Sequence, residues 1–149
     1  MKPHGEKDIA DRLCADMDLV GESHEVVGVF IQGSQNYHLE YEGSDIDTKA
    51  IVLPSFHDLI FDTKPASYTI VLPSDEHIDV KDIRLMFDLW KKQNVQFTEL
   101  LFSRYYATNP AYEDIIKNLI DNREMIAHAD THAMVSCMVG VMHEKQHAL

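Results

Sequence analysis

Two aspartates separated by one residue, Asp45 and Asp47, are the side chains best placed to do chemistry together. Successive side chains of a strand point to opposite faces, so a strand over residues 45–53 puts both carboxylates on one face and Ile46 in the core. Such close carboxylates repel each other unless a divalent cation lies between them. Magnesium prefers oxygen ligands and keeps positions open for water and phosphate, so the pair predicts a Mg²⁺ site, with Mn²⁺ as an alternative. Two ions about 4 Å apart can clamp the attacking and leaving oxygens of phosphoryl transfer.

A glycine-serine pair, Gly33-Ser34, follows an apolar, largely β-branched run and precedes the two aspartates by a short loop. Glycine permits a tight turn and a close approach of the backbone to a ligand. The amides that follow, with the Ser34 hydroxyl, can hold phosphate oxygens. Lys49 shares the face of the two aspartates in the predicted strand, where it can contact a triphosphate or offset the acids. We therefore expect a phosphate-binding turn beside the metal site.

The combined pattern resembles the signature of the DNA polymerase β superfamily of nucleotidyltransferases. The runs Gln32-Gly33-Ser34-Gln35-Asn36-Tyr37 and Gly43-Ser44-Asp45-Ile46-Asp47-Thr48-Lys49 resemble the predicted nucleotidyltransferases of bacteria and their phages. The resemblance covers roughly residues 25–103 and extends to Asn94 and Glu99-Leu100-Leu101-Phe102. It implies binding of a nucleoside triphosphate such as ATP. Metal held by the first two acids activates an acceptor hydroxyl, which attacks the α-phosphate and expels pyrophosphate.

A third carboxylate on a neighbouring strand normally completes the site in that superfamily. Asp79 is the predicted third ligand or base, because burial of Ile78 and Val80 would leave Asp79 on the opposite face with His77 and Lys81. Glu76 and Asp82 are the competing carboxylates, and Asp82 has the alternative role of capping the next helix. Asn36 and Tyr37 are weaker candidates for contacts with sugar or base.

The sequence departs from the family pattern in two places. Gln93 and Val95 stand where a glycine and a proline are expected around Asn94, which affects a helix junction rather than the chemistry. Members of the family continue beyond the point that corresponds to Leu149, so a shortened helical region is expected. Such shortening would keep the metal and triphosphate site and weaken binding of the acceptor. The acceptor itself is a small molecule, a protein side chain or an RNA end.

The pattern of apolar residues predicts an α+β fold: a small mixed, mainly antiparallel sheet with packed helices and a C-terminal helical extension. The nucleotidyltransferase domain is expected over residues 1–103 and the extension, without strands, over 104–149. The methionines at 134, 138 and 142 share one helical face and are expected to fill the core. The other expected elements are a helix over 6–19, strands over 25–32 and 45–53, a hairpin of 67–72 with 76–80, and a helix capped by Asp82 with Ile83, Met86, Phe87 and Trp90 on its apolar face.

Charge and composition make some classes of function unfavourable for this protein. The chain has 149 residues, 45% of them hydrophobic, and its 13 Lys and Arg against 25 Asp and Glu give a formal charge of −12. Such a charge disfavours DNA binding and makes an RNA acceptor less favourable than the others. No apolar run approaches a membrane span and no secretory signal is present, so a cytoplasmic protein without membrane partners is expected. Cys14 and Cys137 are read as reduced thiols.

Two rival functions remain open. His143-Glu144-Lys145-Gln146-His147 spells H-E-x-x-H, which on a helix can bind zinc and act as a metallohydrolase; His128 and His132 could add ligands. The alternative is that these histidines are solvent-exposed side chains of a helix and bind no metal. The second rival is a noncatalytic, antitoxin-like module that binds a helical protein partner through its acidic surface or its tail. A homo-oligomer is also possible.

Overall fold

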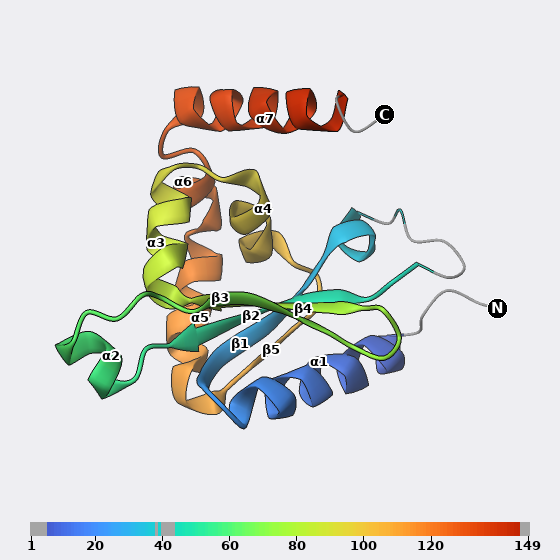
Figure 1. Cartoon of the computed structure of the whole chain (residues 1–149). Coiled ribbons are helices and arrows are strands. Elements are labelled where there is room, and N and C mark those ends of the chain that lie inside the picture. The colour runs from blue at the N-terminus through green and yellow to red at the C-terminus, as the bar shows by residue number, and fades with distance from the viewer. Residues whose placement is uncertain (1–5, 38, 40–43, 147–149) are drawn as a thin grey trace.

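A five-stranded sheet with the order β3-β4-β2-β1-β5 runs through the molecule. The computed structural model describes residues 6–37, 39 and 44–146 (Figure 1). Strands β2 and β4 are parallel, and all other neighbours are antiparallel. This confirms the predicted mixed, mainly antiparallel sheet of an α+β fold. The strands are β1 (Glu25–Gln32), β2 (Asp47–Leu53), β3 (Ser67–Val71), β4 (His77–Asp82) and β5 (Tyr106–Thr108).

Helices cover both faces of the sheet (Figure 1). The long helix α1 (Glu6–Gly21) lies on one face, as predicted for residues 6–19. The other face carries α3 (Ile83–Lys91), α4 (Val95–Thr98) and the 3₁₀ turn η2 (Glu99–Phe102). The remaining helical segments are η1 (Gly33–Tyr37), α2 (Phe56–Ile60), η3 (Pro110–Tyr112), α5 (Glu113–Asp121), α6 (Arg123–Ala127) and α7 (Thr131–Gln146). No helix of the described residues combines the length and apolar character needed to cross a bilayer.

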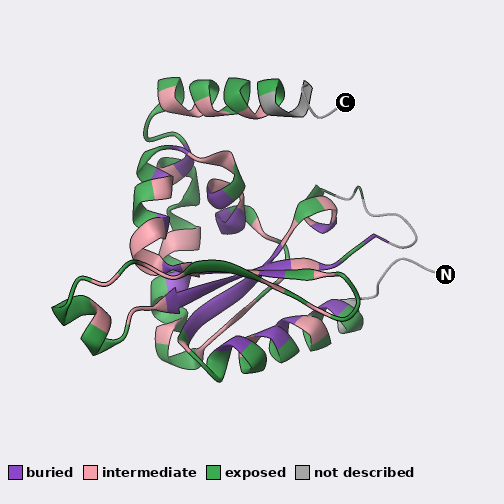
Figure 2. Cartoon of the chain, viewed as in Figure 1, coloured by how far each residue is buried: buried purple, intermediate pink, exposed green. Residues whose placement is uncertain are grey.

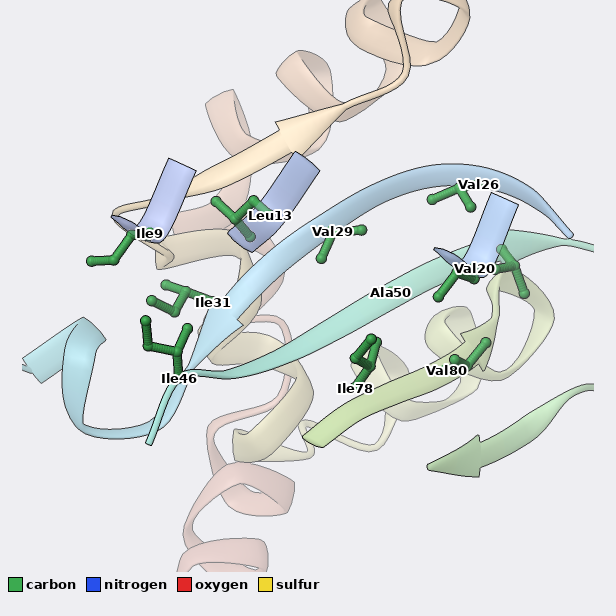
Figure 3. Close-up of a cluster of buried hydrophobic side chains, with 11 residues drawn as sticks. Ile9, Leu13, Val20, Val26, Val29, Ile31, Ile46, Ala50, Ile78 and Val80 are labelled. Carbon is green, nitrogen blue, oxygen red and sulfur yellow. The ribbon is translucent and has the colours of Figure 1, made fainter. Parts of the chain in front are cut away.

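The apolar core on the α1 side is built from alternate residues of the three inner strands. Ile9 and Leu13 of α1 pack there against β1, β2 and β4, and β1 and β2 are buried along most of their length (Figures 2 and 3). Ile78 and Val80 of β4 are fully buried in this cluster, as predicted, and so is Ile46 just before β2. The side chains between them must therefore point to the opposite face. That parity sets the positions of the polar residues that β2 and β4 contribute to the candidate site.

The helix after β4 begins as predicted and packs as predicted, with one exception. Asp82 caps α3, because its carboxylate accepts a 2.9 Å hydrogen bond from the Arg84 amide. Met86 and Trp90 are buried against the second face of the sheet. Phe87 was expected on the same apolar face, but it is 49% exposed. Its ring instead meets the edge of the Trp90 ring, with the centroids 5.8 Å apart, so Trp90 occupies the sheet contact and Phe87 lies at its rim.

A fifth strand corrects the prediction that residues beyond 97 contain no strand. Strand β5 pairs antiparallel with β1, so the sheet continues past residue 103, where the helical extension was expected to begin. Its three residues are too few to show an alternating pattern. A side chain at Gly28 of β1 would place its Cβ 3.0 Å from the Ala107 carbonyl oxygen, so the close approach of β5 depends on glycine at this position. Formation of β5 therefore depends on a contact with a residue that is far away in the sequence.

The methionine stripe of α7 does not fill the core, contrary to the prediction. Met138 is 49% exposed and Met142 is 63% exposed, whereas Met134 is half-buried. Figure 1 shows α7 lying away from the sheet, beyond α4 and α6. A helical period identifies one apolar face, but it does not say whether a second layer covers that face.

Two predictions hold with shifted boundaries. Strand β2 begins at Asp47 rather than Asp45, and β3 and β4 form the predicted antiparallel hairpin. The expected turn after Gly33 begins as η1, while residues 38 and 40–43 lie outside the described part of the chain. Both cysteines are free thiols, as predicted.

Gln93, which replaces an expected glycine, adopts a backbone conformation that glycine favours, with φ of +51°. Its side chain is 1% exposed and donates from Nε2 to the carbonyls of Trp90 and Ile126, each at 2.8 Å. We expect Gln93→Ala and Gln93→Gly both to lower the free energy of unfolding, because both lose these bonds. The glycine variant should be about 1 kcal/mol more stable than the alanine variant, because only alanine keeps the left-handed strain. Urea denaturation measures the difference, and equal stabilities would contradict it.

Candidate functional site

The polar face of the sheet opens into a pocket of about 710 Å³ between the strands, η1 and the α4–η2 segment. Strand β2 contributes Asp47 and Lys49, and the parallel strand β4 contributes its three outward residues. The register places Lys49 beside Asp79. The lining residues of β4 are His77, Asp79 and Lys81. The predicted grouping of Asp47, Lys49 and Asp79 on one face is therefore present.

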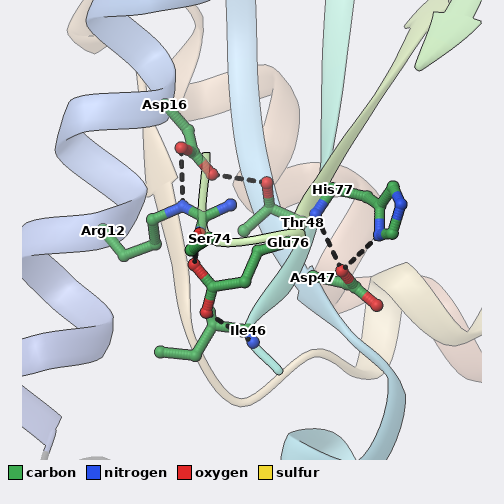
Figure 4. Close-up of polar contacts among 8 residues, drawn as sticks. All are labelled: Arg12, Asp16, Ile46, Asp47, Thr48, Ser74, Glu76 and His77. Carbon is green, nitrogen blue, oxygen red and sulfur yellow. Dashed lines mark hydrogen bonds and ion pairs between the residues drawn. The ribbon is translucent and has the colours of Figure 1, made fainter. Parts of the chain in front are cut away.

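Asp47, the first residue of β2, is held at the pocket by β4 (Figure 4). Its Oδ1 accepts a 2.9 Å hydrogen bond from the His77 amide and lies 3.3 Å from the His77 Nδ1. Asp45 is exposed in the segment before β2 and does not line the pocket. Ile46 between them is buried, as strand parity requires. Asp45 therefore lies in the coil before β2 rather than in the predicted strand, so strand alternation does not place it on the face of Asp47, whereas Asp47 is fixed by two contacts.

Asp79, the predicted third carboxylate, forms ion pairs with two lysines. Its Oδ2 lies 3.2 Å from Lys49 Nζ, and its Oδ1 lies 2.9 Å from Lys81 Nζ. Lys49 is only 4% exposed along its side chain, and its ammonium group lies 3.8 Å from the centroid of the Phe97 ring. Burial lowers the pKa of Lys49, and Asp79 acts in the opposite direction. Lys49 is thus a buried cation, and Asp79 is its principal anionic partner.

The two competing carboxylates have structural roles. Glu76 accepts a 3.0 Å hydrogen bond from the Ile46 amide and pairs with Arg12 of α1, on the side of the sheet away from the pocket (Figure 4). Asp82 is buried and caps α3. Of these three carboxylates, only Asp79 lines the pocket.

The glycine-serine turn begins η1 at the pocket wall. Gly33 has φ of +79°, which an L side chain rarely adopts, and it lines the pocket, whereas Ser34 is half-buried beside it. Asn36, a weaker candidate for ligand contacts, instead ties the turn to the rest of the fold. Its Nδ2 donates to the Ile31 carbonyl at 2.9 Å, and its Oδ1 accepts from Ser103 Oγ at 3.2 Å.

Four further residues reach the pocket that the sequence patterns did not single out as site residues, and one of them is Gln32 at the end of β1. Thr69 comes from β3, and Gln96 and Glu99 come from the segment after α3. Tyr37 donates its hydroxyl hydrogen bond to Glu99; burial and this carboxylate raise the pKa of Tyr37 to about 12. Glu99 lay within the quoted Glu-Leu-Leu-Phe run, which was its sequence signal, but no local pattern indicates that Thr69 or Gln96 faces the pocket.

The charge balance of the pocket favours a cation accompanying an anionic ligand. Asp47, Asp79 and Glu99 oppose Lys49 and Lys81, in a protein of formal charge −12. A triphosphate entering alone would meet net repulsion, which a divalent ion removes. The oxygen donors suit Mg²⁺. Among the described residues no three acidic, histidine or cysteine side chains are grouped for a metal, so phosphate and water would have to complete its coordination.

The zinc alternative involves residues at the edge of the described chain. His128, His132 and His143 are exposed, and His128 Nδ1 lies 2.7 Å from the Glu124 carbonyl oxygen. The Glu144 side chain and His147 lie outside the described residues, so the H-E-x-x-H motif stays a prediction.

Comparisons with known proteins add no family assignment. The chain matches no protein-family model and no curated protein.

Proposed function

We propose that the protein transfers a nucleoside monophosphate from a nucleoside triphosphate to a hydroxyl acceptor. The observation that carries this proposal is the set of Asp47, Lys49, Asp79 and Lys81 on one face of the parallel pair β2 and β4, opening with Gly33 into one polar pocket. Acids and lysines on adjacent strands provide both a place for a metal and counter-charges for phosphate. The resemblance to polymerase β-like nucleotidyltransferases supports the same reaction.

Each group would have one role in the proposed reaction. Asp45 and Asp47 would hold Mg²⁺, which supplies positive charge to the phosphates when bound. The turn at Gly33 and Ser34 would hold phosphate oxygens through amides and the hydroxyl. Lys49 and Lys81 lie beside the pocket as ion-pair partners of Asp79, and an entering phosphate would compete for them.

The reaction forms one bond and breaks one. The acceptor oxygen attacks the α-phosphorus, and the bond from that phosphorus to the bridging oxygen breaks, so that pyrophosphate leaves with the electron pair. Asp79 would accept the hydroxyl proton once phosphate has drawn the lysines away. The acceptor, whether a small molecule, a protein side chain or an RNA end, would approach from the open side of the pocket.

Calorimetric titration of nucleoside triphosphates, with magnesium and then with EDTA, tests the proposal. We expect binding only with magnesium, and Mn²⁺ should substitute because it accepts the same oxygen ligands. Binding that is indifferent to EDTA, or no binding of any nucleoside triphosphate, would overturn the proposed function.

The variant Lys49→Met tests whether Lys49 binds phosphate or only packs within the fold. Methionine fills a similar space, and Asp79 retains Lys81, so we expect the free energy of unfolding to change by less than about 1 kcal/mol. Affinity for the magnesium nucleotide should fall by about tenfold, because one phosphate counter-charge is lost. Calorimetry measures the affinity, and Lys117→Met on the exposed face of α5 is the matched control. Unchanged affinity would assign Lys49 to packing alone.

The partner-binding alternative has one observation in its favour. Four large apolar side chains are exposed on α7, and a contiguous exposed apolar patch is typical of an interaction surface: Val135, Met138, Val139 and Met142. A helical partner or a second copy could cover it. Stable complex formation without any nucleotide binding would favour this role over the transferase.

A further inference from the structure

Glu99, at the start of η2, lines two pockets of opposite character. One is the polar pocket of the candidate site, and the other is a pocket of about 290 Å³ whose wall is mostly apolar. The apolar residues of that wall are Val95, Phe102, Ala127, Met134 and Met138. A ligand that reaches from the polar pocket into the apolar one therefore has its middle part beside Glu99.

The Glu99 carboxylate is fixed through one oxygen and has the other oxygen available. Tyr37 donates its hydroxyl hydrogen bond to Oε2. Burial and this carboxylate raise the pKa of Tyr37 to about 12, so the hydroxyl keeps its proton and stays a donor at neutral pH. Within the described part of the chain, Tyr37 is the only side chain that donates to this carboxylate. Oε1 can therefore accept a hydrogen bond from a ligand.

The charge of Glu99 limits what that ligand group can be. The two lysines of the polar pocket, Lys49 and Lys81, pair with Asp79. A carboxylate without a cationic partner repels phosphate, so the phosphates of a nucleotide would not lie against Glu99. An ionised carboxylate accepts hydrogen bonds and cannot donate them, so its partner must be a donor such as a hydroxyl group.

The spacing along η1 places such a donor in the sugar of a nucleotide. Gly33 begins η1 and Tyr37 ends it, and a 3₁₀ helix rises about 2 Å per residue, so their backbones are about 8 Å apart. Phosphates held at Gly33 would thus leave the sugar, the next part of the molecule, near Tyr37 and Glu99. Gln96, one turn before Glu99, lines the polar pocket as well, and its amide can both donate and accept.

We propose that Glu99 binds a hydroxyl group of the ribose, so that the protein selects ribonucleoside triphosphates over deoxyribonucleoside triphosphates. This inference rests on the proposed function for the position of the phosphates. A ribose hydroxyl donates to Glu99 Oε1, while Tyr37 holds Oε2, and Gln96 offers a second polar contact on the same side. The base lies toward the apolar pocket, and the selection needs no contact with any particular base.

Three nucleotides with the same base and the same phosphates test this selection. They are ATP, 2′-deoxy-ATP and 3′-deoxy-ATP, titrated calorimetrically with magnesium. We expect at least one deoxynucleotide to bind about tenfold more weakly than ATP, because it lacks a hydrogen bond to a charged acceptor. Equal magnesium-dependent affinities for all three would overturn the inference and leave the proposed function intact. If none of the three binds with magnesium, the proposed function fails, and the inference fails with it.

The variant Glu99→Leu removes the acceptor and tests the residue itself. We expect the preference for ATP to fall to about twofold or less, whereas affinity for magnesium tripolyphosphate should not fall, because that ligand has no sugar. Glu99→Gln should keep part of the preference, since an amide oxygen still accepts. Glu22→Leu, at an exposed position after α1, is the control and should keep all of it. Circular dichroism checks that each variant is folded.

Two results with these variants would contradict the role of Glu99. Full preference for ATP in Glu99→Leu would show that another group selects the sugar. An equal loss of affinity for ATP, both deoxynucleotides and tripolyphosphate would instead make Glu99 a ligand of the metal, because only the metal is common to all four.

Discussion

Changing Asp45 and Asp47 together to asparagine should lower the affinity for magnesium nucleotides by about 100-fold or more. Both carboxylates are assigned to the metal, and an amide is a neutral and weaker ligand. Asparagine can still accept the hydrogen bond that the His77 amide donates to Asp47, so the free energy of unfolding should change by less than about 1 kcal/mol. Calorimetric titration with and without magnesium measures the loss.

Single changes divide this effect between the two acids. Asp47 lines the pocket, whereas Asp45 is exposed in the preceding coil and does not line it, so Asp47→Asn should account for the larger share. Asp18→Asn on exposed α1 removes the same charge from the protein away from the site and should leave affinity unchanged. Wild-type affinity in the double variant would refute the metal assignment. Unfolding of the variant could only lower the affinity, so it could not produce this result.

The second large effect is expected in a buried polar network behind the site. Asp16 of α1 is 2% exposed; its Oδ2 accepts a 2.6 Å hydrogen bond from Thr48 Oγ1, and its Oδ1 lies 2.7 Å from Arg12 Nε (Figure 4). Arg12 also pairs with Glu76, which accepts from the Ile46 amide. The network thus links α1 to the segment that leads into Asp47. Removing the Asp16 carboxylate leaves the buried Thr48 hydroxyl without its acceptor and leaves the Arg12 guanidinium with Glu76 as its remaining ion-pair partner.

Asp16→Ala should therefore lower the free energy of unfolding by about 3 kcal/mol. Asp16→Asn should cost less, because an amide oxygen still accepts from Thr48 while the ion pair with Arg12 is lost. Urea denaturation followed by circular dichroism gives both values, and Asp18→Ala on the same helix is the exposed control. A loss below about 1 kcal/mol for Asp16→Ala would show that the network contributes little.

Coupling between this network and the site can be measured at a temperature where the variants remain folded. Because Glu76 holds the Ile46 amide, loosening of the network should reach Asp47 through one residue of backbone. We expect Asp16→Asn to bind magnesium nucleotide several-fold more weakly than the wild type, although Asp16 does not line the pocket. Unchanged affinity would confine the network to stability.

Neighbouring residues in the sequence were sufficient to predict most helices and strands, and also the strand residues on one side of the site. Strand parity requires Asp79 to oppose Ile78 and Val80, and the structure has this arrangement. The cap at Asp82 and the turn at Gly33 likewise depend on a few neighbouring residues. These features were predictable because alternation, capping and a left-handed turn are set by the backbone within a few positions.

The remaining features depend on which distant segments of the chain pack together. Four features have no local signal in the sequence. They are the parallel register that puts Lys49 beside Asp79, the approach of β5 to Gly28, the exposure of the α7 methionines, and the position of Glu99 in the lining of two pockets. Periodicity marks a face as apolar or polar, but neighbouring layers determine what that face contacts. The sequence alone therefore determined the types of chemical group available, and the packing of separate elements determined which of them share a pocket.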